Sequence, residues 1–401
     1  MRAILAAAGV WLLVTVSFAH QRPVFPGTLD QHPSIDYRGG AVSDVATNLL
    51  RDVNDGRTKL TFAGTQGFLL SLLDKLGVPV ESQILLFSKT GIQHPFTSPE
   101  RPRALYFNDR VVVGYIPGAP FIELASHDPR QGVVFQSVTQ NPVVPLQTAR
   151  PDRCTTCHLS GNTMFVPGIL VRSNFTAADG RTMPALGNFI IDHRTPLEQR
   201  WGGWYVTGTH GAARHMGNAM VTDPSKPEGA IGEATLNRST LPDLVEAAAY
   251  PRQTSDIAAL MVFDHQGRAM NLLTSLGWAA RVAKAEGRLD FSKGELRDLA
   301  RETADYFALV DEAKLAAPIQ GVSEFQKTFS NTGPRDRKGR SLRALDLQTR
   351  LFTYRCSYMI YSPAFDALPP EARAAVLARM RELITDRDTI EILDETKAGW
   401  R

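Results

Sequence analysis

The pentapeptide Cys154-Thr155-Thr156-Cys157-His158 constrains this chain more than any other sequence feature, because it specifies a covalent partner. Its two thiols stand three positions apart, a spacing that lets them form thioether bonds to the two vinyl groups of one porphyrin. The histidine that follows then ligates the porphyrin iron as its proximal ligand. With three cysteines and nine histidines in 401 residues, this pattern arises by chance with a probability of about 10⁻³ or less. We therefore expect one haem c, covalently held by Cys154 and Cys157, with His158 on the iron.

Two other interpretations of the motif remain open. A redox-active dithiol would need a thioredoxin-like β-α-β context, which the flanking sequence lacks. A zinc half-site would need a second pair of ligands, yet Cys356 is the one other cysteine and stands about two hundred residues away. The motif also lies in the middle of a long chain, whereas a small soluble cytochrome c is a domain of roughly a hundred residues. Most of the chain must therefore do more than hold the haem.

The N-terminus has the pattern of a secretory signal peptide. Arg2 precedes an almost unbroken apolar stretch over residues 3–16, and Ser17-Phe18-Ala19 resembles a signal-peptidase site. Cleavage after Ala19 would export the protein, to the periplasm in a Gram-negative bacterium, and leave no membrane span. The alternative is an uncleaved anchor helix, although about 20 apolar residues are usually needed to span a bilayer. Export agrees with the motif, because covalent haem attachment requires assembly outside the cytoplasm.

The remaining sequence predicts an α+β fold in successive regions. After the signal peptide at 1–19, residues 20–82 combine an extended leader with helices at 41–53 and 68–76. Short β-branched and aromatic runs separated by turn residues predict a small antiparallel β-meander at 83–140, with strands at 83–87, 104–107, 111–116, 121–125 and 133–138. Residues 141–240 form a loop-rich haem-binding segment. The region 241–401 is mainly helical, with expected helices at 255–284, 293–313, 342–360 and 371–384.

The sixth iron ligand decides between electron transfer and catalysis, and methionine and histidine are the usual candidates. Several lie in the loop-rich segment: Met183, His193, His210, His215, Met216 and Met220. Met216 is our first candidate, because the intervening loop is long enough to pass around the porphyrin edge and Gly217 permits close approach of the backbone. His215 and His210 follow. His265 shares a helix face with Met261, where we expect a histidine satisfied by packing.

Two further segments have alternative interpretations. The aromatic, glycine-containing stretch 201–208 packs either on the porphyrin or as a strand turning a corner in the core. A basic cluster of Arg335, Arg337, Lys338, Arg340 and Arg343 would contact haem propionates or an acidic redox partner, or else form a solvated loop.

Composition excludes several classes of protein. With 43% hydrophobic and 21% charged residues the chain is globular rather than disordered or fibrous. A net charge of only +3 argues against nucleic-acid binding. The sequence contains no G-x-S-x-G elbow of a serine hydrolase, no P-loop and no G-x-G-x-x-G dinucleotide motif.

The chain also resembles a family of large exported bacterial monohaem cytochrome c domain proteins. The resemblance rests on the segments 106–109 (YFND), 192–194 (DHR), 201–208, 215–218 (HMGN) and 355–358 (RCSY), and it covers most of the mature chain. It implies haem binding and electron transfer, but it names no substrate. Di-haem cytochrome c peroxidases share only the C-x-x-C-H motif, and the second motif that they need is absent from this sequence.

We therefore expect a periplasmic monohaem c-type cytochrome that transfers one electron at a time to or from an unidentified periplasmic redox protein. The alternatives are a peroxidase-like haem enzyme with an open distal site and a haem-based sensor.

Overall fold

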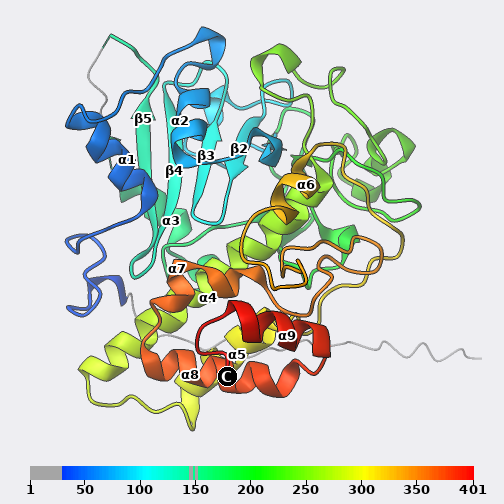
Figure 1. Cartoon of the computed structure of the whole chain (residues 1–401). Coiled ribbons are helices and arrows are strands. Elements are labelled where there is room, and N and C mark those ends of the chain that lie inside the picture. Colours follow the sequence, from blue (N-terminus) through cyan, green and yellow to red (C-terminus); the bar gives the residue numbers. More distant parts are fainter. Residues whose placement is uncertain (1–28, 144–147, 150–151) are drawn as a thin grey trace, which may run out of the picture.

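The computed structural model describes residues 29–143, 148–149 and 152–401. The expected signal peptide and the first part of the leader therefore lie outside the described residues. The fold is α+β: an antiparallel sheet occupies the N-terminal half, and the C-terminal half is mostly helical (Figure 1).

The sheet has seven antiparallel strands in the order β6-β5-β4-β3-β2-β1-β9. The strands are β1 (Ile84–Leu86), β2 (Arg103–Phe107), β3 (Val111–Tyr115), β4 (Phe121–Asp128), β5 (Gly132–Thr139), β6 (Thr148–Ala149) and β9 (Trp204–Tyr205). All five strands of the predicted meander are confirmed. The pairing of β9, from the loop-rich segment, with β1 was not predicted.

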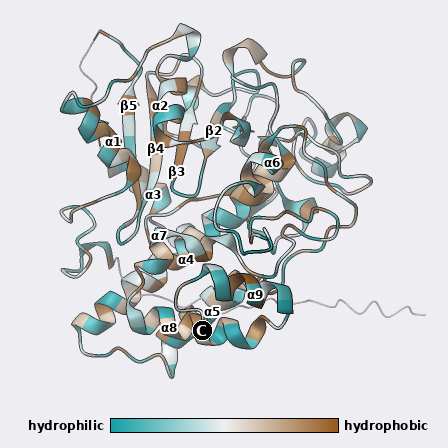
Figure 2. Ribbon diagram, viewed as in Figure 1, coloured by the Kyte–Doolittle hydropathy of each residue, from teal (hydrophilic) through white to brown (hydrophobic). Residues whose placement is uncertain are grey.

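Two amphipathic helices cover one face of this sheet, as Figures 1 and 2 show. They are α1 (Val45–Asn54) and α2 (Leu69–Leu76), and both were predicted. Asp44 caps α1, since its carboxylate accepts hydrogen bonds from the backbone N–H groups of Ala46 and Thr47. Buried leucines of α2 pack with strand residues such as Val113 and Leu124, which point to this face.

The opposite face of the sheet packs against the long helix α4 (Ile257–Ala285) and irregular residues of the loop-rich segment. The rings of Phe107 on β2 and Phe263 on α4 lie 5.0 Å apart between centroids. Asp256 caps α4 by accepting from the N–H groups of Ala258 and Ala259. Ser255, the first residue of the helix expected at 255–284, does not cap α4. Its hydroxyl donates to the carbonyl of Tyr205 and accepts from the N–H of Leu85, so it joins the start of the helix to the sheet.

The other helices gather around the far end of α4, below the sheet in Figure 1. They are α5 (Gly294–Phe307), α7 (Pro363–Asp366), α8 (Pro370–Leu383) and α9 (Arg387–Thr396), while α6 (Phe325–Ser330) packs beside α4 nearer the sheet. The predicted helix at 371–384 is confirmed as α8. The helix predicted to reach residue 313 ends at Phe307, where Leu309 and Asp311 adopt positive φ angles of 55° and 60°.

The prediction of a helix at 342–360 was wrong. This segment is irregular until a short 3₁₀-helix at Tyr358–Tyr361. Asp346 accepts hydrogen bonds from the side chain and N–H of Thr349, and Leu347 has a φ of 55°, so a local turn replaces the helix. Leu351 and Phe352 are nevertheless buried in the main core, which explains why their spacing resembled a helix.

The loop-rich segment was predicted at 141–240, and its described residues from 152 onward consist mainly of loops, with a two-stranded ribbon of β7 (Arg172–Asn174) and β8 (Asn188–Ile190). No helix in the part of the chain that the structure describes is long and apolar enough to cross a membrane.

Candidate haem site

The C-x-x-C-H motif forms one compact helical turn. A 3₁₀-turn at Asp152–Cys154 leads directly into α3 (Thr155–His158), so the two cysteines, three positions apart, lie on one side of the turn. Cys154 is half-buried against the core and Cys157 is exposed. Burial raises the pKa of the Cys154 thiol to about 11, which keeps it protonated at neutral pH.

His158 is held in one tautomer and one orientation. Its Nδ1 lies 2.9 Å from the carbonyl oxygen of Gly168, and a carbonyl only accepts, so Nδ1 carries the proton and donates. The N–H of Gly168 donates in return to the carbonyl of His158. The lone pair of Nε2 is therefore left for a metal, and this second-shell arrangement is typical of ligating histidines. Burial lowers the pKa of His158, which favours the neutral form that a metal needs.

Gly168 is required for this close approach. A Cβ at that position would lie 2.2 Å from the Oδ1 atom of Asn271 on α4. Asn271 in turn accepts from the N–H of Ile169 and donates to its carbonyl, so α4 fixes the segment that orients His158. The ring of Phe135 on β5 packs against the imidazole, with 4.8 Å between centroids.

The motif borders a cleft of about 340 Å³ between the sheet, the segment 153–174 and α4. Its lining includes all three motif side chains that we expected to bind haem. The apolar part of its wall includes Leu86, Leu105, Val112, Ala125, Phe135, Ile169, Trp204 and Phe263. An apolar wall next to two thiols and a metal-ready imidazole suits a planar, largely apolar ligand such as a porphyrin.

The cleft also contains charged residues that sequence reasoning missed. Arg103 and Glu123 form an ion pair on the sheet. Arg153 and Arg172, which belong to the loop-rich segment, line the cleft as well. The period of two along the strands placed Arg103 and Glu123 on the same face as Leu105 and Ala125. That signal was available in the sequence, but the register that brings the two side chains together was not.

The three candidates for the sixth ligand lie elsewhere among the described residues. Met216 is buried, and its sulfur accepts a hydrogen bond from Ser173 Oγ at 3.5 Å. His215 Nδ1 accepts from the N–H of Gly217, and His210 Nε2 accepts from the N–H of Asn237. Among the described residues that line the cleft, His158 is the only histidine or methionine.

A second group of histidines is fully buried beside α4. The Nδ1 atoms of His193 and His265 are 2.8 Å apart, so one donates to the other. His265 Nε2 lies 2.7 Å from Ser357 Oγ, and the ring of Tyr306 stacks on its imidazole at 5.3 Å. The expectation that His265 is satisfied by packing is confirmed. His193 Nε2 is buried without a hydrogen-bond partner among the described residues.

Next to this pair lies a buried carboxyl group. Asp264 Oδ2 accepts from Trp201 Nε1 at 2.9 Å and lies 3.5 Å from Arg200 Nη1. Burial is the largest influence and raises the pKa of Asp264 to about 7. The aromatic stretch 201–208 therefore contributes to both regions. Trp201 donates a hydrogen bond to the buried Asp264, whereas Trp204 lines the cleft.

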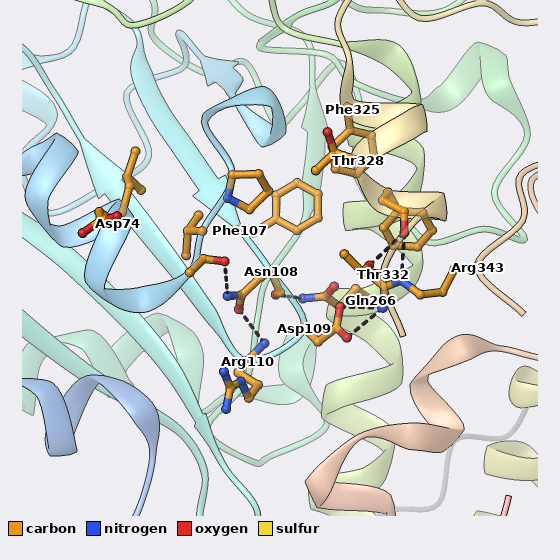
Figure 3. Close-up of a pocket in the computed structure, with 15 residues that line it drawn as sticks. Asp74, Phe107, Asn108, Asp109, Arg110, Gln266, Phe325, Thr328, Thr332 and Arg343 are labelled. Carbon is orange, nitrogen blue, oxygen red and sulfur yellow. Dashed lines mark hydrogen bonds and ion pairs between the residues drawn. The ribbon is translucent and has the colours of Figure 1, made fainter. Parts of the chain in front are cut away.

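The basic cluster at 335–343 does not reach the cleft. Lys338 and Arg340 form ion pairs with Glu391 of α9. Arg343 binds Asp109 at 2.7 Å and lies over the rings of Phe329 and Tyr358. This ion pair borders a separate pocket of about 460 Å³, shown in Figure 3, in which the Arg343 and Asp109 side chains face one another. Through these contacts the cluster joins α9, α6 and the loop that follows β2, which is a structural role.

The described residues contain no cluster of three or more His, Cys, Asp and Glu suited to a metal ion. Cys356 is buried in the main core, and burial raises the pKa of its thiol. Comparison of the chain with protein-family models, curated proteins and solved structures finds no match.

Proposed function

We propose that this chain is an exported monohaem c-type cytochrome that transfers one electron at a time. One observation carries the proposal. His158 donates through Nδ1 to Gly168 and leaves Nε2 free, while the neighbouring thiols border the same apolar cleft. When bound, the haem iron supplies the redox couple. The chain supplies two thioether attachments at Cys154 and Cys157, the proximal ligand at His158, and a wall that limits the access of water.

The first test concerns covalent attachment. Haem should stay with the chain through acid–acetone extraction and denaturing electrophoresis. Cys157→Ser should impair covalent incorporation, whereas Cys356→Ala, which removes the buried and distant thiol, should leave it intact. Free extraction of the colour from the wild-type protein would refute the thioether bonds and the proposed function with them.

Export is part of the same proposal and rests on the N-terminal sequence. Expression in a Gram-negative host should give a periplasmic protein that begins at His20, as cell fractionation and N-terminal sequencing would show. A chain that remains in the membrane fraction with Met1 intact would support the uncleaved anchor instead. We further propose a periplasmic redox protein as the partner.

The second candidate function is a peroxidase-like haem enzyme or a haem-based sensor with an open distal site. A specific observation favours it, since His158 is the only histidine or methionine among the described residues lining the cleft. Ligation by Met216, our first candidate for the sixth ligand, would require its sulfur to leave Ser173.

A visible and low-temperature EPR spectrum of the ferric protein separates the two functions. A low-spin spectrum that becomes high-spin in Met216→Ala supports electron transfer with Met216 on the iron. A low-spin spectrum lost in His215→Ala or His210→Ala keeps the function and changes the ligand. A high-spin wild type that binds cyanide and turns over peroxide supports the enzyme.

A further inference from the structure

Two arginines of the cleft have unused hydrogen-bonding capacity. The Nε atoms of Arg103 and Arg172 are buried, yet neither has a hydrogen-bond partner among the described residues. Both side chains line the cleft that contains Cys154, Cys157 and His158. A buried guanidinium N–H without an acceptor is costly, and an anion in the cleft would relieve that cost.

The guanidinium of Arg103 is positioned before any ligand arrives. It forms an ion pair with Glu123, two strands away, and the pair crosses β3 directly above Gly114. A Cβ at Gly114 would lie 3.2 Å from Arg103 Nε and 3.3 Å from a carboxylate oxygen of Glu123. Gln93 Nε2 donates to the other oxygen of Glu123 at 3.1 Å, which fixes the carboxylate. The sheet therefore holds Arg103 in one place by contacts on several sides.

Charge and polarity together define the ligand. Arg103, Arg153, Arg172 and Glu123 are the charged residues that line the cleft within the described chain, which leaves a net charge of +2. The rest of the wall is largely apolar. A matching ligand is flat and apolar with two carboxylate groups, which is the chemistry of an iron porphyrin with free propionates.

We propose that Arg103 and Arg172 bind the propionate carboxylates of the haem, with Glu123 as the residue that positions Arg103. The inference rests on the proposed function and deepens it, because it assigns the acidic edge of the haem to named side chains. These arginines take the place of the basic cluster at 335–343, in which Lys338, Arg340 and Arg343 form ion pairs away from the cleft. A guanidinium suits this role because its rigid fork binds a carboxylate through two parallel hydrogen bonds.

The test measures reversible binding, which covalent attachment would obscure. In the full-length Cys154→Ala, Cys157→Ala variant, zinc protoporphyrin IX and its dimethyl ester are each titrated by fluorescence. The two ligands differ at the propionates alone: the ester lacks the two negative charges and carries two additional methyl groups. We expect the diacid to bind roughly 10- to 100-fold more tightly, as charge-assisted hydrogen bonds of this kind imply.

Substitutions then assign that preference to residues. Arg103→Gln and Arg172→Gln should each reduce the preference for the diacid at least several-fold, while binding of the ester stays the same. Arg103→Lys should retain part of it. Arg181→Gln is the matched control, because Arg181 is an exposed arginine paired with an exposed aspartate, Asp179.

Equal affinity of the parent variant for diacid and ester would overturn the proposal, and this comparison does not depend on whether an arginine variant folds. An unchanged preference in both folded glutamine variants would overturn it as well. Haem staining of the wild type on a denaturing gel tests the proposed function separately. Covalent haem without diacid preference refutes only the arginine assignment. Diacid preference without covalent haem refutes the thioether attachment and the proposed function with it, and leaves the two arginines as a binding site for a porphyrin diacid.

Discussion

The structure contains two histidine regions of opposite character, the cleft around His158 and the buried pair His193–His265. In the cleft, one imidazole nitrogen is used by a backbone carbonyl and the other is left for a ligand. In the buried pair, both nitrogens of His265 have partners, Ser357 and His193, and Tyr306 covers its ring. The first arrangement prepares a histidine to bind a metal, and the second uses a histidine to join distant segments of the chain.

This difference shows that burial alone does not identify a functional histidine. Burial lowers the pKa of all three imidazoles, so each is held neutral. What separates them is the neighbouring space, which is a cleft beside two cysteines for His158 and packed side chains for His265. Substitutions in the two regions should therefore affect different properties of the protein.

The largest effect is expected from His158→Ala. Without its proximal ligand the cleft should retain no stably ligated haem, and covalent incorporation should fall below detection by haem staining. The apoprotein should lose no more than about 1 kcal/mol of unfolding free energy, because the side chain is only partly buried and packs on a single ring. His94→Ala, at an exposed histidine, is the control. Retention of a wild-type haem spectrum in His158→Ala would show that His158 is not the proximal ligand, and the contrast between the two histidine regions would no longer hold.

The converse substitution, His265→Ala, should leave attachment of haem intact and lower stability instead. It creates a cavity in the core and removes hydrogen-bond partners from the buried side chains of His193 and Ser357. Such changes typically cost about 3 kcal/mol. Urea unfolding of the apoprotein would measure the loss. A loss below about 1 kcal/mol would mean that the pair contributes little to the core.

The same pair predicts sensitivity to acid. Burial, the largest cause, lowers the pKa values of His193 and His265 well below their usual value, so the unfolded chain binds protons that the folded chain does not. Stability is therefore lost as pH falls below about 6.5, by about 1.4 kcal/mol per pH unit for each histidine.

Asp264 has the opposite effect on the pH dependence of stability. Its raised pKa, about 7, means that the folded chain holds a proton that the unfolded chain has released, so stability falls as pH rises between about 4 and 7. The informative quantity is thus the difference between the wild type and His265→Gln in urea midpoints from pH 7.5 to 5. The variant should show the shallower acid loss, and equal slopes would contradict the assignment.

The features of the fold and of the candidate site that could be predicted are those whose residues lie close together along the chain. The C-x-x-C-H motif and the five strands both follow from local spacing; the strands are confirmed, and the haem that the motif predicts stays a prediction. The contacts of His193 with His265 and of Arg103 with Glu123 join residues that are 72 and 20 positions apart and depend on how α4 and the sheet pack. The helix expected at 342–360 failed for a related reason, since tertiary burial produced the apolar spacing without helical geometry.

The smallest effect is expected at Gly114 in the wall of the cleft, where a substitution can displace Arg103 without removing a functional side chain. An alanine there would bring a methyl group within 3.2–3.3 Å of Arg103 and Glu123, so the ion pair must shift by a few tenths of an ångström. Strand formation favours alanine over glycine by about 0.5–1 kcal/mol, so the unfolding free energy should change by less than about 1 kcal/mol. Preference for the porphyrin diacid over its ester should nevertheless fall a few-fold, because the arginine is displaced from its position. Gly229→Ala, at a glycine with open space around it and no positive φ, tests the cost of adding a methyl group away from the cleft. A normal preference for the diacid in a folded Gly114→Ala variant would show that binding of the propionates does not depend on the exact position of Arg103. The cleft wall would then tolerate a displaced side chain, unlike the packed core around His265.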